Sequence, residues 1–115
     1  MDSWDIRYIK GLSLLLVIKR GDTRNAIQAT LRKNGQSVNL TDCNVRFLMS
    51  NGIEGFTVVT NAENGELFYS LEKSAVEKSG IFHYEFEVQY PDGRVETFPN
   101  DGYLKLHIKQ DLGGV

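Results

Sequence analysis

The chain has 115 residues, with 13 Lys or Arg against 15 Asp or Glu, so its formal net charge at pH 7 is −2. This length suits one domain, and 41% hydrophobic with 24% charged residues is a globular rather than a disordered composition. The near-neutral charge argues against a nucleic-acid partner, the single cysteine excludes an intrachain disulfide, and no apolar run approaches the roughly 20 residues of a membrane helix.

The first predicted element is an N-terminal segment, residues 1–11, in which Trp4, Ile6 and Tyr8 alternate with polar residues. This alternation predicts a short strand, because successive side chains of a strand point to opposite faces. The segment is either an edge strand of the domain or an arm that becomes ordered on a partner protein. Trp and Tyr are enriched at interface hot spots, so the second alternative makes Trp4, Ile6 and Tyr8 candidate protein-docking residues.

Residues 12–110 are predicted to form one domain built mainly of strands, and residues 111–115 follow as a C-terminal tail. Residues 12–19 are apolar on both faces, which indicates a strand covered on both sides. Shorter strands are predicted at residues 56–60 and 67–71. In the other strands one face is apolar, and these faces consist of Ile27, Ala29 and Leu31; of Cys43, Val45, Phe47 and Met49; of Phe82, Tyr84, Phe86, Val88 and Tyr90; and of Leu104, Leu106 and Ile108.

Glycines mark the predicted turns between these strands. Five of the 11 glycines follow Asn or Asp directly, and these dipeptides allow the positive φ angles of tight hairpins. Their spacing predicts an all-β domain of seven to eight antiparallel strands, with one short helical turn within residues 72–79. Two packed sheets are the economical way to bury one face of each strand, which predicts a β-sandwich. The five dipeptides are Asn34-Gly35, Asn51-Gly52, Asn64-Gly65, Asp92-Gly93 and Asp101-Gly102.

Few residues could carry chemistry. His83 and His107 occupy outward strand positions, and two histidines fall short of the four ligands of a structural zinc site. Cys43 shares the parity of core residues, which indicates a small buried hydrophobe. Glu85 and Glu87 are typical of a solvated strand face, and no catalytic or phosphate-binding motif occurs. We therefore expect no enzyme, no metal site and no cofactor.

Several segments, taken in order, look like one known family. Gly21-Asp22-Thr23 follows the first long strand, and an Asn-Gly then Leu-Thr segment, residues 33–41, leads into the strand at Val45. Residues 64–71, residues 80–86 and the turn at residues 90–93 continue the pattern. Over residues 12–110, the chain resembles the N-terminal domain of siphophage baseplate upper proteins.

The resemblance implies an immunoglobulin-like β-sandwich that acts by protein–protein interaction, as a non-catalytic structural protein of a phage or prophage virion. It implies attachment to other baseplate or tail proteins, homo-oligomers within the assembly, and a virion assembled in the host cytoplasm. Members of the family typically continue into a C-terminal region that carries receptor-binding proteins. The chain is therefore expected to be either one domain of a longer protein or a small virion protein without that region.

A second function class is a carbohydrate-binding or adhesin-type sandwich. Such modules stack sugar rings on exposed aromatic side chains, and Phe68, Phe98 and Tyr103 fall outside the predicted core set. These aromatics either form a ligand-binding surface or fill the interior of the second sheet.

Overall fold

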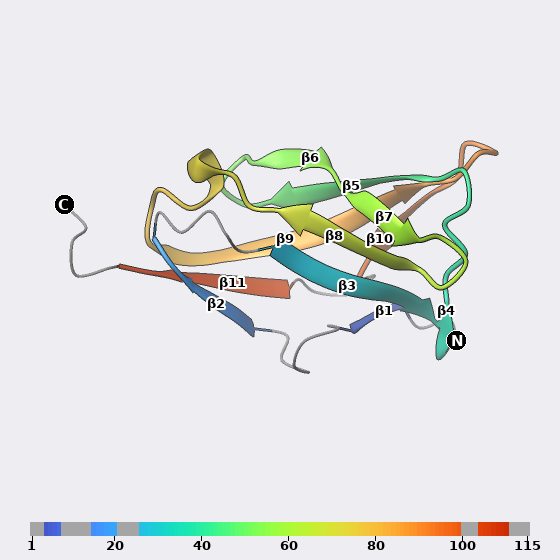
Figure 1. Cartoon of the computed structure of the whole chain (residues 1–115), viewed down its shortest axis with the longest axis horizontal. Coiled ribbons are helices and arrows are strands. Elements are labelled where there is room, and N and C mark those ends of the chain that lie inside the picture. Colours follow the sequence, from blue (N-terminus) through green and yellow to red (C-terminus); the bar gives the residue numbers. More distant parts are fainter. Residues whose placement is uncertain (1–3, 8–14, 21–25, 100–103, 111–115) are drawn as a thin grey trace.

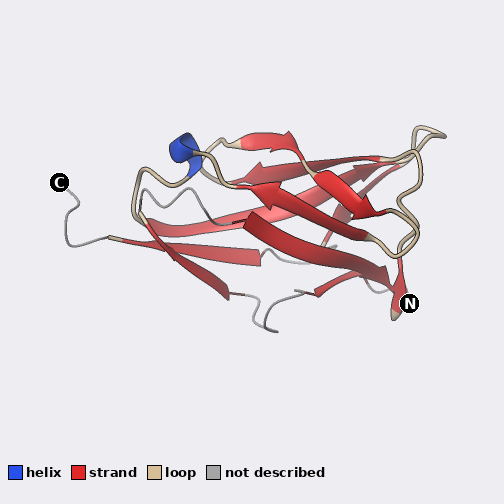
Figure 2. Cartoon of the chain, viewed as in Figure 1, coloured by secondary structure: helices blue, strands red, loops and turns tan. Residues whose placement is uncertain are grey.

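A computed structural model describes residues 4–7, 15–20, 26–99 and 104–110 of the chain. Its strands form two layers, and the 3₁₀ turn η1 joins β8 to β9 (Figures 1 and 2). The elements in chain order are β1 (Trp4–Arg7), β2 (Leu15–Lys19), β3 (Ala26–Lys33), β4 (Gln36–Ser37), β5 (Asn44–Met49), β6 (Glu54–Phe56), β7 (Val58–Asn61), β8 (Glu66–Ser70), η1 (Lys73–Ala75), β9 (Gly80–Gln89), β10 (Val95–Phe98) and β11 (Leu104–Lys109).

The two layers are separate sheets. Sheet A has the strand order β1-β3-β8-β7, with β4 paired to β3, and sheet B has the order β2-β11-β9-β5-β6, with β10 paired to β9. The long strand β9 organises sheet B, because its first half pairs with β11 and its second half with β5 and β10. Both edges of β9 are therefore occupied along most of its length.

This strand order confirms the expected immunoglobulin-like sandwich. In that fold strands A, B, E and D form one sheet and C, F and G the other, which matches β1-β3-β8-β7 and β5-β9-β11 here. The N-terminal stretch contributes to both layers, since β1 joins sheet A and β2 joins sheet B. The pair formed by β2 and β11 is parallel, and every other pair among the described strands is antiparallel.

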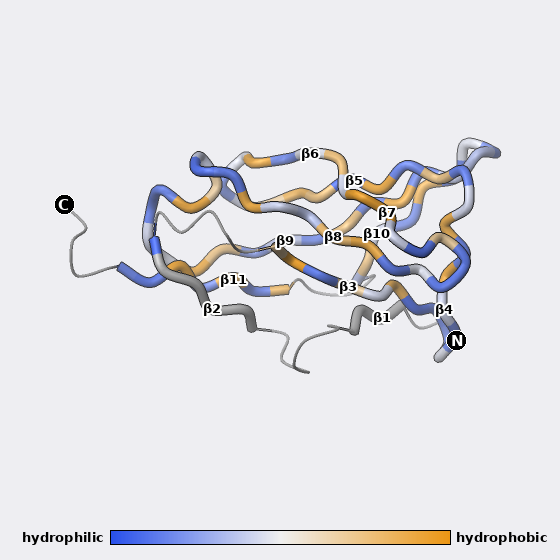
Figure 3. Tube along the Cα trace, in the orientation of Figure 1, coloured by the Kyte–Doolittle hydropathy of each residue, from blue (hydrophilic) through white to orange (hydrophobic). Residues whose placement is uncertain are grey.

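The core lies between the sheets and follows the predicted period-2 pattern. Figure 3 shows hydrophobic and hydrophilic residues alternating along the strands. Phe47 of β5 is fully buried at the centre, where its ring stacks on Tyr69 of β8 with centroids 4.2 Å apart and meets Phe86 of β9 edge-on at 5.8 Å. The predicted inward sets of β3, β5, β9 and β11 are confirmed, with Cys43, Phe82 and Tyr90 partly buried at the margin of the core.

Four of the predicted Asn-Gly and Asp-Gly turns lie in described residues, and each reverses the chain. The β3–β4 hairpin turns at Asn34 and Gly35, whose φ angles of 54° and 78° are the two positive values of a type I′ turn. Gly65, with φ 70°, precedes β8 directly. The fifth dipeptide, Asp101-Gly102, lies outside the described residues.

The number of strands differs from the expectation of seven to eight, since eleven are described. The strand predicted at residues 56–60 is divided at Thr57, where the chain leaves sheet B and enters sheet A. There the Thr57 amide and hydroxyl both donate to the Val45 carbonyl, at 2.9 and 3.0 Å. The short strands β4 and β10 were not predicted, because two to four residues are too few for a periodic signal. The helical turn is confirmed as η1.

Candidate functional site

The solvent-facing side of sheet B, which we call the outer face, holds most of the large apolar side chains that the described residues expose. Phe56, Ile81 and Val95 are 64%, 62% and 55% exposed. The strand register places them opposite Arg46, His107 and Gln89, which have outward parity, and directly opposed residues of a pair share one face. Val58, 53% exposed, lies opposite Phe68 on sheet A.

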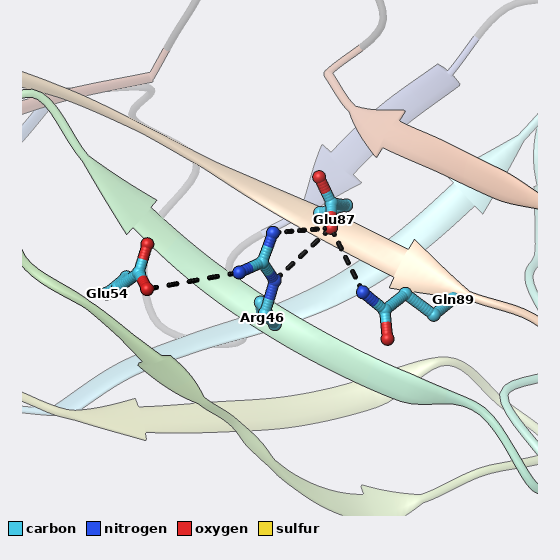
Figure 4. A network of polar contacts seen from close by, with 4 residues as sticks. All are labelled: Arg46, Glu54, Glu87 and Gln89. Atoms are coloured by element: carbon cyan, nitrogen blue, oxygen red, sulfur yellow. Dashed lines mark hydrogen bonds and ion pairs between the residues drawn. The ribbon is translucent and has the colours of Figure 1, made fainter.

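A network of polar side chains crosses this face around Arg46 (Figure 4), and Arg46 lies opposite Phe56 in the strand register. The Arg46 guanidinium donates to Glu87 Oε1 from both Nε at 3.2 Å and Nη2 at 2.8 Å, and its Nη1 lies 4.0 Å from Glu54 Oε1. Gln89 Nε2 donates to the same Glu87 oxygen at 3.3 Å. The hydrogen bond to Glu87 raises the pKa of Arg46, so the guanidinium remains charged. The network was not predicted from the sequence, where its only local signal is the outward parity of Arg46 and Glu87.

A shallow pocket of about 350 Å³ lies beside the network, between β5 and β9. Its walls include Leu48, Ser50, His83 and Glu85. Ser50 ties the two strands together here, because its amide donates to the His83 carbonyl at 2.8 Å and its hydroxyl accepts from the His83 amide at 3.0 Å. The pocket therefore lies over hydrogen-bonded strands, and its lining includes a carboxylate and an imidazole.

The predicted docking residues of the N-terminal segment are only partly described. Trp4 and Ile6 belong to β1, where the register places them opposite Lys33 and Leu31 of β3. Tyr8 lies outside the described residues. Strand β1 itself belongs to sheet A and not to the outer face of sheet B.

The two described aromatics that were candidates for sugar stacking, Phe68 and Phe98, do not share an exposed surface. Phe98 is fully buried, which is the second of the two alternatives: it pairs with Phe86 in register and fills the core. Phe68 is half-buried on sheet A opposite Gln28. Tyr103 lies outside the described residues.

The described part of the chain contains no group of three His, Cys, Asp or Glu side chains that could hold a metal ion. His83 and His107 lie on adjacent strands of the outer face, where His83 is opposite Lys105 and His107 is opposite Ile81. None of the helices in the described residues is long and apolar enough to cross a membrane.

Cys43 is half-buried, and its thiol donates weakly to the Thr41 carbonyl at 3.6 Å. Burial first, and then the nearby Asp42 carboxylate, raise the pKa of the thiol. Because the thiolate is the reactive form, we expect alkylation of Cys43 by iodoacetamide to require a higher pH in the folded chain than in the same chain unfolded in urea. Rate constants measured across pH 7–10 in both states check this, and equal pH profiles would contradict it.

A second polar cluster joins the sheets at the other end of β9. Lys33 of β3 pairs with Glu96 of β10 at 3.1 Å between Nζ and Oε2, and the Arg94 guanidinium lies 4.8 Å above the Tyr90 ring. Burial and the hydrogen bond to Glu96 raise the pKa of Tyr90, so its hydroxyl stays protonated. A pocket of about 340 Å³ lies here, but its charged groups pair with one another, as Arg94 also does with Asp92 at 2.7 Å. The cluster therefore links sheet A to sheet B at this end of the sandwich.

Two solved structures share this fold. The N-terminal domain of phage TP901-1 ORF48 superposes with a TM-score of 0.63 at 23% identity, covering 82% of this chain and 84% of that one. CopC from Methylosinus trichosporium OB3b superposes with a TM-score of 0.50 at 16% identity, covering 85% of this chain and 86% of that one. At these identities the likeness establishes the fold alone. A search of curated protein sequences found no significant match.

The superpositions establish only the fold, and a family model identifies the family. The model of the BppU N-terminal domain, the first domain of the baseplate upper protein, matches residues 13–98. This span covers most of both sheets, from before β2 to the end of β10. The chain therefore belongs to the BppU N-terminal domain family and is a structural module of the phage baseplate.

Proposed function

We propose that this chain works without catalysis in the virion, where it docks onto other tail or baseplate proteins and associates with further copies of itself. The observation that carries this proposal is the outer face of sheet B. Protein–protein interfaces combine aromatic and aliphatic side chains with arginine and a polar surround. Phe56, Ile81 and Arg46 on this face have that composition.

The N-terminal segment is proposed as a second contact. In the described part of the chain β1 pairs with β3 alone, so it is an edge strand of sheet A. An edge strand presents unpaired backbone groups to a neighbouring chain, and Trp4 and Tyr8 are of the residue types enriched at hot spots. In this proposal Trp4, Ile6 and Tyr8 contribute to docking while the outer face of sheet B makes a separate contact.

The test is incorporation into a complex with the other baseplate proteins of the same phage, by co-expression and size-exclusion chromatography. We expect the full chain to enter the complex and a chain with Trp4, Ile6 and Tyr8 all replaced by serine to enter at least about 10-fold less, as loss of one hot spot would produce. A chain without residues 1–10 should behave like the triple variant.

The matched control changes Asp5 and Arg7, the intervening positions of the same strand, to serine. The control should enter the complex normally and keep the circular dichroism spectrum of the full chain. If the full chain stays outside the complex, the docking function is wrong. If the triple variant enters as well as the control, Trp4, Ile6 and Tyr8 have no role in docking.

A further inference from the structure

We propose that the outer face of sheet B binds the same face of a second copy of this chain, forming a dimer with two-fold symmetry. This inference rests on the self-association in the proposed function and assigns it to a surface. No described element covers the face, since Ile81 and Phe56 on it are 62% and 64% exposed. The distribution of charge, the positions that a two-fold rotation exchanges and the size of the face all favour a second copy as the occupant.

Charge on the outer face is divided between its two ends. At one end, β11 carries Lys105 and Lys109, both exposed and both at outward positions, with a formal charge of +2. At the other end, β5, β6 and the second half of β9 carry three carboxylates and one guanidinium, with a formal charge of −2. Those four groups are Glu54, Glu85, Glu87 and Arg46. The face is therefore bipolar, with the lysines of β11 beside the first half of β9 and the carboxylates on and beyond its second half, across the strands as well as along them.

A bipolar face is complementary to itself. In a two-fold interface the same patch meets itself, so residue i contacts residue j of the second copy and residue j contacts residue i. An axis that lies between two such faces, perpendicular to the line joining the basic and acidic ends, sets each basic end on the acidic end of the second copy. Lys105 then faces the side of Glu85 and Glu54, in both directions at once.

The same rotation exchanges an exposed apolar side chain with a hollow. Ile81 lies on β9 at the basic end, and the Leu48 pocket lies between β5 and β9 toward the acidic end. Because the two-fold rotation reverses the direction of β9, Ile81 of each copy comes to lie toward Leu48 of the other. The pocket of about 350 Å³ has room for an aliphatic side chain, and its Glu85 rim meets the lysine end. Apolar burial thus supplies affinity while the charges set the orientation.

The face is large enough for such a dimer. The strands of sheet B lie side by side in the order β2-β11-β9-β5-β6 (Figure 1). A standard interface buries about 800 Å² on each partner, and five adjacent strands around the ten-residue β9 cover about that area at roughly 3.3 Å per residue and 4.8 Å per strand. The polar rim and the partly exposed Arg46 network fit a dimer that is weakened by salt, since screening acts on exposed charges.

The test reverses the charge of one end at a time. The acidic variant carries Lys105→Glu and Lys109→Glu, which makes both ends negative, and the basic variant carries Glu54→Lys and Glu85→Lys, which makes both ends positive. Each alone should self-associate about 100-fold or more less tightly than the unmodified chain in sedimentation equilibrium, because like charges then meet at both ends. An equimolar mixture of the two variants should form a heterodimer, since opposite charges then meet at both ends.

Matched controls place the same charge changes elsewhere, as Lys73→Glu with Lys78→Glu and Glu63→Lys with Glu77→Lys, all at exposed positions off the outer face. These should dimerise like the unmodified chain. If the unmodified chain dimerises and neither face variant weakens it, the assigned surface is wrong while self-association stands. If the unmodified chain is monomeric at every concentration, self-association itself fails, and the face is left to a baseplate protein of different sequence.

Discussion

Replacing Phe47 with alanine is expected to lower the free energy of unfolding by about 3–5 kcal/mol, the usual cost of removing a buried aromatic ring. Phe47 is fully buried and contacts rings of both sheets, stacking on Tyr69 at 4.2 Å and tilting against Tyr84 at 5.5 Å. Its loss leaves a cavity between the two sheets, because the surrounding side chains can relax only partly into the space. Urea denaturation followed by circular dichroism measures the change.

The matched control is Phe56→Ala, which removes the same ring from the same sheet. Phe56 is 64% exposed, so its truncation should change the free energy of unfolding by less than about 0.5 kcal/mol. A comparable loss of stability in the two variants would contradict the assignment of Phe47 to the centre of the core. Phe56→Ala also tests function, because it should weaken a contact made through the outer face while leaving the fold intact.

Replacing Gly65 with alanine is expected to cost about 2–5 kcal/mol, combining left-handed backbone strain with a steric clash. Gly65 has φ +70°, and a Cβ atom built there would lie 2.7 Å from the Leu31 carbonyl oxygen and 2.8 Å from the Val38 carbonyl oxygen. These are backbone atoms at a point where three segments converge, since the Leu31 amide also donates to the Gly65 carbonyl at 2.9 Å. The crowded atoms therefore cannot move aside without disturbing sheet A.

Gly35→Ala separates the two causes. Gly35 has φ +78° but no atom within 4 Å of a built Cβ, so alanine there should cost only the backbone strain, about 1–2 kcal/mol. Thermal or urea unfolding of both variants measures the difference, which isolates the clash at Gly65. Equal costs at the two glycines would show that the close approach of the Leu31 and Val38 carbonyls is unimportant.

Much of the fold was predictable because its signals are local. Alternation along β9 and β11 identifies their buried faces without any knowledge of their partners, and Asn34-Gly35 identifies a hairpin from two residues. The division at Thr57 was not predictable in this way. It depends on a strand leaving one sheet for the other, and the hydrogen bonds that hold Thr57 to Val45 join residues 12 positions apart.

The candidate site was less predictable than the fold. Arg46 and Glu87 are 41 positions apart in the chain, and they meet only because β5 and β9 pair in one particular register. A shift of one residue would send each side chain to the opposite face. Phe98 illustrates the same limit, since an aromatic in a four-residue strand carries no periodic signal, and its pairing with Phe86 places it in the core.

The sequence by itself determined the class of the fold, the parity of the core strands and most of the hairpins, because these follow from period-2 alternation and from the φ angles that Asn-Gly and Asp-Gly allow. Its resemblance to the baseplate family was likewise visible in turns and core residues. Only the tertiary structure decided which outward residues share a face. The gathering of Ile81, Phe56, the Arg46 network and the lysines of β11 on one side of sheet B is a product of strand order and register. Those are set by pairing between distant segments, for which a single sequence carries no local signal.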